Sequence, residues 1–278
     1  MSRSRTNRKV AWVAGAAVVV ALILAYANRV AIRDAYEGLT APPLPVAETY
    51  TPIIVATPRS DSGQAVTEET VPSVAATTSE PTAVSIPAEK LLDVPFMSQA
   101  PHANWDMPYQ EACEEASALM VRGYYQGVTG RYDPNDADRL ILDLVAFQKK
   151  QYGYYEDTSA TETKRFIEAA FPELEAEVVP LDGPGSIIRY VAQGIPVILP
   201  ADGKTLPNPN FRNGGPKYHM LVVRGYTKDR FITNDPGTRK GENFTYTYDG
   251  LLDAVHDWNN GDVPHGRRVM IIVRPKSL

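Results

Sequence analysis

Residues 108–117 read PYQEACEEAS and contain Cys113, the single cysteine of this 278-residue chain. Small and apolar side chains recur here at helical spacing, which predicts a helix from about 108 to 125 with the cysteine in its first turns. One cysteine permits no disulfide within the chain, so the folded part must rely on a hydrophobic core. Cys113 is therefore either a small buried side chain or a working thiol.

The segments that follow predict further helices and then strands. Asp133 before Pro134 predicts the start of a second helix, and Ser159 with Glu162 forms a capping box for a third. We also expect a short helix at 186–193, an edge strand at 92–97, and strands at 195–199, 218–226, 230–233, 244–248 and 269–273. This order predicts an α+β domain, with a helical subdomain packed on a mostly antiparallel sheet.

The N-terminal third of the chain has a different composition. A basic segment at 1–9 precedes an apolar run at 10–27, which predicts a transmembrane signal anchor, or a signal peptide cleaved after Ala27. Residues 28–90 are rich in Pro, Thr and Ala and predict a disordered linker. Residues 91–278 then form the folded domain. We expect this domain outside the cell, on a single-pass anchor in the cell membrane, or secreted if the signal is cleaved.

Charge and residue spacing limit the classes of partner. The formal net charge is −5 and charged residues make up 22% of the chain, which argues against nucleic acid as a partner. The His and Cys residues show no zinc-motif spacing, so we expect no metal and no cofactor.

Two further residues could activate the thiol. His219 lies near the start of one expected strand and Asp235 ends the next, and a tight turn between these strands would place the two side chains together. A helix N-terminus and a neighbouring imidazolium lower the pKa of a thiol. The histidine would take the thiol proton and the carboxylate would orient the imidazole.

Several motifs in the domain resemble those of the C39-like peptidases. This is family thirty-nine of the cysteine peptidases, a papain-like group related to bacteriocin leader-processing peptidases. The matching stretches are VPFMSQ at 94–99, the cysteine helix with its Ala-Ser, GIPV at 194–197, the histidine followed by VVRGY at 222–226, and NDP at 234–236. The resemblance implies a papain-like fold, with Cys113 as nucleophile, His219 as base and Asp235 as orienting residue. It also implies hydrolysis of a peptide or related amide bond through a thioester, on a peptide or protein substrate.

Two features near the cysteine bear on its chemistry: a glutamine that could help to hold the oxyanion, and the two glutamates that follow the cysteine. A glutamine side chain could help the cysteine N–H to hold the oxyanion; Gln99 is favoured by its motif and Gln110 by its proximity. Glu114 and Glu115 stand where many relatives have Gly-Pro. On a helix they can point away from the thiol and complement the helix dipole.

Two alternative functions fit the same residues. The domain could be an inactive papain-like module that binds a peptide or glycan, or a hydrolase acting on the stem peptides of cell-wall peptidoglycan.

Overall fold

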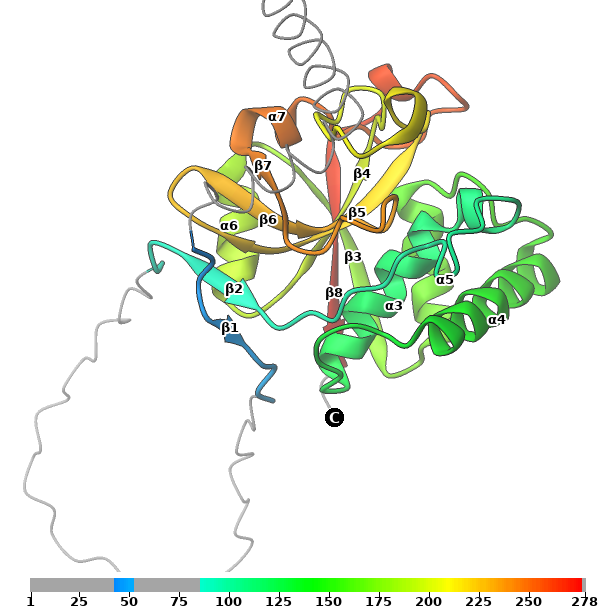
Figure 1. Cartoon of the computed structure of the whole chain (residues 1–278), viewed down its shortest axis with the longest axis horizontal. Coiled ribbons are helices and arrows are strands. Elements are labelled where there is room, and N and C mark those ends of the chain that lie inside the picture. Colours follow the sequence, from blue (N-terminus) through cyan, green and yellow to red (C-terminus); the bar gives the residue numbers. More distant parts are fainter. Residues whose placement is uncertain (1–42, 53–85, 277–278) are drawn as a thin grey trace, which may run out of the picture. The chain divides into compact units, whose positions relative to one another are not determined.

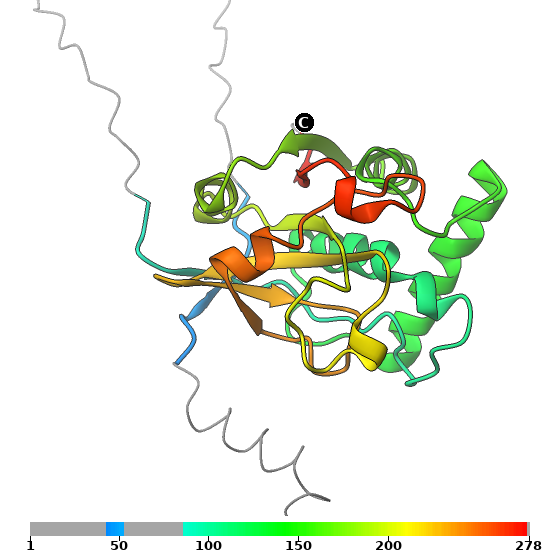
Figure 2. The same ribbon diagram turned by 90° about the horizontal axis from the view of Figure 1, so that it is seen from above.

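The computed structural model describes residues 43–52 and 86–276. Three helices, α3 (Cys113–Tyr125), α4 (Pro134–Tyr152) and α5 (Ala160–Ala170), precede most of the strands and lie together beside the sheet (Figure 1). The other α-helices among the described residues are α6 (Pro184–Ala192) and the short α7 (Tyr248–Leu252). Figure 2 shows the same arrangement from above. The predicted α+β class is confirmed.

The sheet has eight strands, and strand β5 is at its centre. Its strands are β1 (Ala47–Glu48), β2 (Lys90–Leu92), β3 (Leu174–Pro180), β4 (Val197–Ala201), β5 (His219–Tyr226), β6 (Arg230–Asn234), β7 (Phe244–Thr247) and β8 (Val269–Pro275). All pairings are antiparallel except that of β1 with β2. Strands β4 and β6 both pair with β5 at Val222 and Val223, so they occupy its two edges. Because β5 is interior, all its residues are buried, including His219 at its first position.

Local capping signals fix the helices that surround the site. The Asp133 side chain accepts a hydrogen bond from the Asn135 N–H at 2.9 Å, and α4 ends at Gly153 in the left-handed conformation. The capping box of Ser159 and Glu162 is present at the start of α5. Both predicted helix starts are therefore confirmed.

The structure differs from the predicted elements at several boundaries. The segment leading to the cysteine forms a short 3-10 helix, Tyr109–Glu111, and α3 begins only at Cys113 because Ala112 has a non-helical conformation. Strand β3 had no predicted counterpart, and Tyr248, which was expected in a strand, begins helix α7. The edge strand predicted at 92–97 is displaced to Lys90–Leu92.

Part of the predicted linker is ordered against the domain. Strand β1 adds to β2 in parallel, and the Lys90 ammonium lies 2.7 Å from the Glu48 carboxylate. Tyr50 packs edge-on against Tyr124 and Tyr125 at the end of α3, with ring centroids 5.7 and 4.9 Å apart. Pairs of aromatic rings in this geometry contribute roughly 0.5–1.5 kcal/mol beyond their buried area. These contacts explain why a Pro- and Thr-rich segment is held here.

The predicted membrane span at 10–27 lies outside the described residues. Within 43–52 and 86–276, no helix combines the length and apolar character needed to cross a bilayer.

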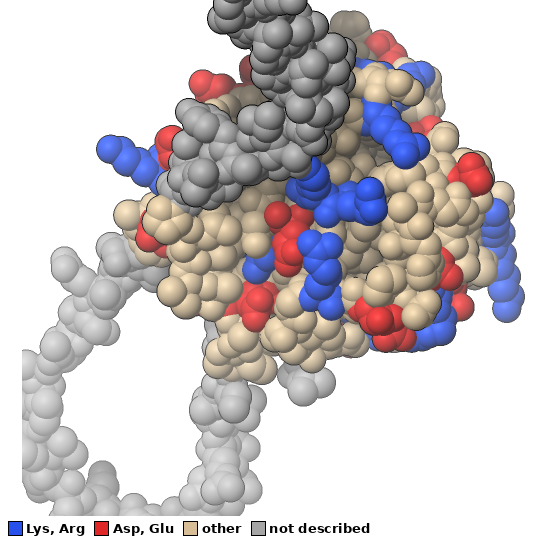
Figure 3. Space-filling view, viewed as in Figure 1, with Lys and Arg blue, Asp and Glu red and all other residues tan. Residues whose placement is uncertain are grey.

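Basic and acidic side chains are interspersed on the face seen in Figure 3. Some of the described ones pair, as Arg131 does with Glu242 at 2.5 Å.

Candidate active site

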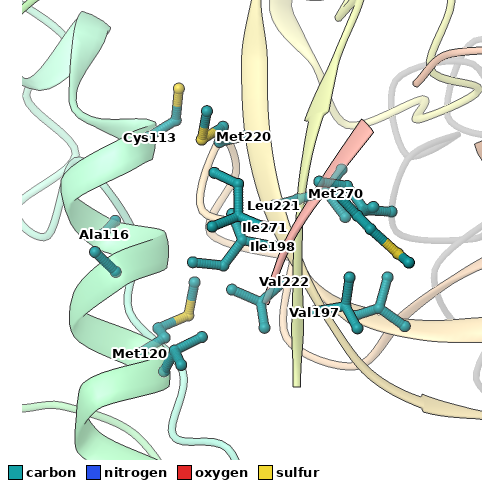
Figure 4. Close-up of a cluster of buried hydrophobic side chains, with 14 of the residues drawn as sticks. Cys113, Ala116, Met120, Val197, Ile198, Met220, Leu221, Val222, Met270 and Ile271 are labelled. Atoms are coloured by element: carbon teal, nitrogen blue, oxygen red, sulfur yellow. The ribbon is translucent and has the colours of Figure 1, made fainter. Parts of the chain in front are cut away.

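Cys113 lies at the point where the helical half meets the sheet. It is the first residue of α3, and Ala116 and Met120 follow it at helical spacing along the face that packs on β5 (Figure 4). The cysteine is only 5% exposed. Its side chain lies beside that of Met220 on β5 (Figure 4), and Met220 directly follows His219 in the chain. Packing of α3 on β5 therefore brings the thiol to the strand end that carries the histidine.

The two glutamates after the cysteine are buried, and the expectation that they point away from the thiol is wrong for Glu114. The Cys113 thiol donates a hydrogen bond to Glu114 Oε2 at 3.0 Å, and Glu114 Oε1 accepts one from the Thr158 N–H at 3.1 Å. Glu115 Oε1 accepts a hydrogen bond from the Gln148 amide on α4 at 2.5 Å. Helix α3 is covered by α4 and by the segment before α5, so its first turn has no side open to water for these carboxylates.

This environment opposes ionisation of the thiol. Burial, and then the adjacent Glu114 carboxylate, raise the pKa of Cys113 well above its usual value, although the Met220 backbone lowers it. Burial also raises the pKa of Glu114 to about 8, and burial together with Glu114 raises the pKa of Glu115. The helix N-terminus therefore does not lower the thiol pKa below its usual range, contrary to the sequence expectation.

His219 and Asp235 form a buried pair, as their motifs predict. His219 Nε2 lies 2.8 Å from Asp235 Oδ1, and the two side chains are 1% and 0% exposed. The β5–β6 register places Gly237 close to the ring, and a Cβ at this glycine would lie 2.7 Å from His219 Cε1. Phe211 packs edge-on against the imidazole with centroids 5.4 Å apart. The ring is therefore fixed by its hydrogen bond and by packing against its neighbours.

Four hydrogen bonds hold the Asp235 carboxylate. Besides His219, Oδ1 accepts from the Gly237 N–H at 3.0 Å. Oδ2 accepts from the Asn208 amide at 3.0 Å and from the Tyr246 hydroxyl at 2.7 Å. Burial alone would raise the pKa of Asp235, but His219 and these hydrogen bonds lower it below its ordinary value. The carboxylate is therefore kept ionised and oriented toward the histidine.

Neither Asn208 nor Tyr246 was predicted as a site residue. Tyr246 was expected only as part of the strand at 244–248. The alternation does predict that Tyr246 shares a face with Phe244, and Tyr246 is the buried one of the two. Nothing in the sequence marks its hydroxyl as a partner of Asp235.

Of the two candidate glutamines, only Gln99 lies buried between the cysteine helix and the Asp235 turn. Its amide donates to the carbonyls of Tyr109 and Gln110 at 2.9 and 3.1 Å, and its N–H donates to the Pro236 carbonyl at 3.1 Å. Its Oε1 is buried without a hydrogen-bond partner among the described residues. The Gln110 side chain is exposed and donates instead to Glu111 at 3.0 Å.

The other histidines lie apart from this site. His102 is exposed, His256 Nδ1 lies 3.1 Å from the Gly266 carbonyl oxygen, and His265 pairs with Asp262 on the surface. In the part of the chain that the structure describes, no cluster of three or more His, Cys, Asp or Glu side chains could hold a metal ion.

A buried cysteine at the start of a helix that packs on a strand with a buried His–Asp pair at its end is the arrangement expected of a papain-like cysteine peptidase. The Peptidase_C39 like family matches residues 91–261, more than half of the chain, and the chain belongs to this family. The family predicted from the motifs is thus confirmed. Since it is a family of cysteine peptidases, it implies a peptide or protein substrate.

Solved structures include a similar chain. A crystal structure from Bacillus anthracis, described as a C39-like peptidase, is 16% identical to this chain, with a TM-score of 0.44. The match covers 68% of this chain and 98% of that one. No curated protein sequence matches the chain.

Proposed function

We propose that the protein is a cysteine peptidase that hydrolyses a peptide or related amide bond through a thioester on Cys113. The observation that carries this proposal is the buried His219–Asp235 pair at 2.8 Å, with His219 on the strand against which the Cys113 helix packs. Asp235 engages Nε2 of the imidazole, which leaves Nδ1 for the thiol proton.

The reaction follows the chemistry of thiol acyl transfer. The Cys113 proton moves to His219 as the sulfur attacks the substrate carbonyl carbon and the carbonyl π electrons move to oxygen. The oxyanion is held by the Cys113 N–H, and we assign the side-chain donor to Gln99, whose amide would turn from the Tyr109 carbonyl toward the substrate. Collapse breaks the C–N bond, and His219 gives its proton to the leaving amine. Water then hydrolyses the thioester by the same route in reverse.

The experiment is digestion of a peptide library by the purified domain, with products read by mass spectrometry and Cys113→Ala as the inactive control. Purified peptidoglycan is a second substrate, which distinguishes stem peptides from protein substrates. We expect cleavage by the wild type alone. Cleavage by neither protein, or equal cleavage by both, would contradict the proposal.

The raised thiol pKa favours a second candidate, a papain-like module that binds a peptide or glycan without cleaving it. This alternative requires that Cys113→Ala leave ligand affinity unchanged and that the wild type release no product from any ligand that it binds. Calorimetry on a bound peptide, followed by mass spectrometry of the same sample, separates the two.

We also propose that the domain is exported and held at the cell membrane by residues 10–27. The support is the basic segment at 1–9 followed by a long apolar run. With the full-length chain expressed in its host, we expect the protein in the membrane fraction and its C-terminal domain digested by protease added to intact spheroplasts. Recovery in the soluble cytoplasmic fraction, protected from that protease, would contradict it.

A further inference from the structure

Both oxygens of the Glu114 carboxylate accept hydrogen bonds, one from the nucleophile and one from a second element. Oε2 accepts the hydrogen bond of the Cys113 thiol at 3.0 Å, and Oε1 accepts that of the Thr158 N–H, just before α5, at 3.1 Å. The residue is 1% exposed. A buried glutamate costs stability unless its oxygens are hydrogen-bonded. Here the thiol itself is one of the two partners.

The groups around this carboxylate are mostly acidic. Glu115 lies next to it on α3, Glu111 acts from the 3-10 helix, and Asp157 acts from the segment before α5. The Tyr218 hydroxyl, from the residue before β5, donates a hydrogen bond to the Thr158 carbonyl at 3.2 Å. Negative charge on any of these opposes a further negative charge on the sulfur. The surroundings of the pair therefore favour a protonated Cys113.

We propose that Glu114 is a positioning residue that holds the Cys113 sulfur by accepting its S–H hydrogen bond, so that the resting enzyme carries a thiol and not a thiolate. The inference rests on the proposed function, in which this sulfur is the nucleophile. When substrate binds, the thiol proton leaves this hydrogen bond for His219, the sulfur bonds to the carbonyl carbon, and Glu114 keeps its own protonation state.

The consequence is a nucleophile that is unreactive until substrate is in place. Alkylating agents and oxidants react with the thiolate, so a thiol held protonated reacts slowly with both. This differs from a preformed thiolate–imidazolium pair, which reacts readily without substrate. The difference can be measured on Cys113 alone because the chain has one cysteine.

The test is the pH dependence of iodoacetamide alkylation of the wild type and of Glu114→Gln. Glutamine retains an oxygen for the Thr158 N–H but presents a neutral amide to the sulfur. We expect the midpoint of the rate profile to fall by about one pH unit or more, because Glu114, with its pKa raised to about 8, is ionised at the alkaline pH where the thiol titrates; alkylation at pH 9 should then be roughly tenfold faster. A change in packing alone would alter the melting temperature without moving this midpoint downward.

Glu111→Gln is the matched control. It removes a carboxylate that acts on Glu114 but makes no hydrogen bond to the sulfur, so its midpoint should stay within a few tenths of the wild type. If Glu114→Gln does not fold, Glu114→Asp replaces it. The shorter side chain retracts the carboxylate from the sulfur and should lower the midpoint by a smaller amount.

An unchanged or higher midpoint in the folded Glu114 variant would overturn the proposal, and so would an equal fall in Glu111→Gln. Alkylation requires no turnover. A protein that cleaves no peptide but shows the midpoint shift would contradict the proposed function and leave this inference standing. A protein that cleaves peptides but shows no midpoint shift in Glu114→Gln would support the proposed function and overturn this inference.

Discussion

Cys113→Ala is expected to lower kcat/KM for a cleaved peptide on the order of 10⁴-fold or more, because it removes the atom that forms the thioester. Cys113 lies on the α3 face that packs on β5, and alanine is tolerated in a helix. We therefore expect the variant to fold and to bind substrate. The measurement is steady-state hydrolysis, with circular dichroism to confirm the fold.

Ser117→Ala is the matched control for this variant. Ser117 lies one turn further along α3, is fully buried, and has an Oγ without a hydrogen-bond partner among the described residues. The substitution removes one polar atom from the same helix without touching the thiol, so kcat/KM should stay within about twofold of the wild type. Equal losses in the two variants would indicate damage to α3 and not loss of a nucleophile.

Asp235→Asn is expected to lower kcat by about 10²- to 10⁴-fold and also to destabilise the fold. The catalytic loss arises because an amide does not fix the imidazole tautomer as a carboxylate does. The stability loss arises because Asp235 Oδ2 accepts from both Asn208 and Tyr246, and an amide nitrogen in that place sets donor against donor. Leaving such buried donors unpaired costs about 1–3 kcal/mol each.

The wild type and Asp235→Asn should also differ in how their free energy of unfolding depends on pH. The pKa of Asp235 is lower in the folded protein than in the unfolded chain. Its contribution to the free energy of unfolding is therefore full above the unfolded value of about 3.9 and is lost as the pH falls through the folded value. Urea unfolding of Asp235→Asn should show a weaker loss of stability below pH 4 than the wild type.

Asp262→Asn provides the control, because His265 and Asp262 form a pair at the same 2.8 Å separation but are 79% and 61% exposed. Exposed pairs contribute little to stability, so this variant should change neither kcat nor unfolding by a measurable amount. Equal changes in kcat and in the free energy of unfolding for Asp262→Asn and Asp235→Asn would contradict the catalytic role of Asp235, because burial and geometry would then not distinguish the two pairs.

The sequence predicted those parts of the fold that local chemistry determines. The starts of α4 and α5 followed from an N-cap aspartate and a capping box, since each acts within a few residues. His219 and Asp235 could be paired in advance because a tight turn joins two consecutive antiparallel strands. Most of the site residues that could be predicted therefore lie on one helix and one hairpin.

Contacts between distant segments could not be predicted in this way. Burial of Glu114 depends on Thr158, and burial of Glu115 depends on Gln148 on α4. The helical pattern of α3 alone gives no sign of either covering element. The two donors to Asp235 Oδ2 likewise come from separate segments, the loop at Asn208 and strand β7. Such partners are set by tertiary packing, which a single sequence does not encode locally.

The most direct test of the account is intact-mass analysis of the enzyme, quenched in acid during turnover of a cleaved peptide. The account predicts a fraction of the protein heavier by the mass of the acyl fragment, with the added mass mapping to Cys113 and absent from Cys113→Ala. Turnover with no acylated protein under conditions that trap thioesters, or an acyl group on any other residue, would contradict it.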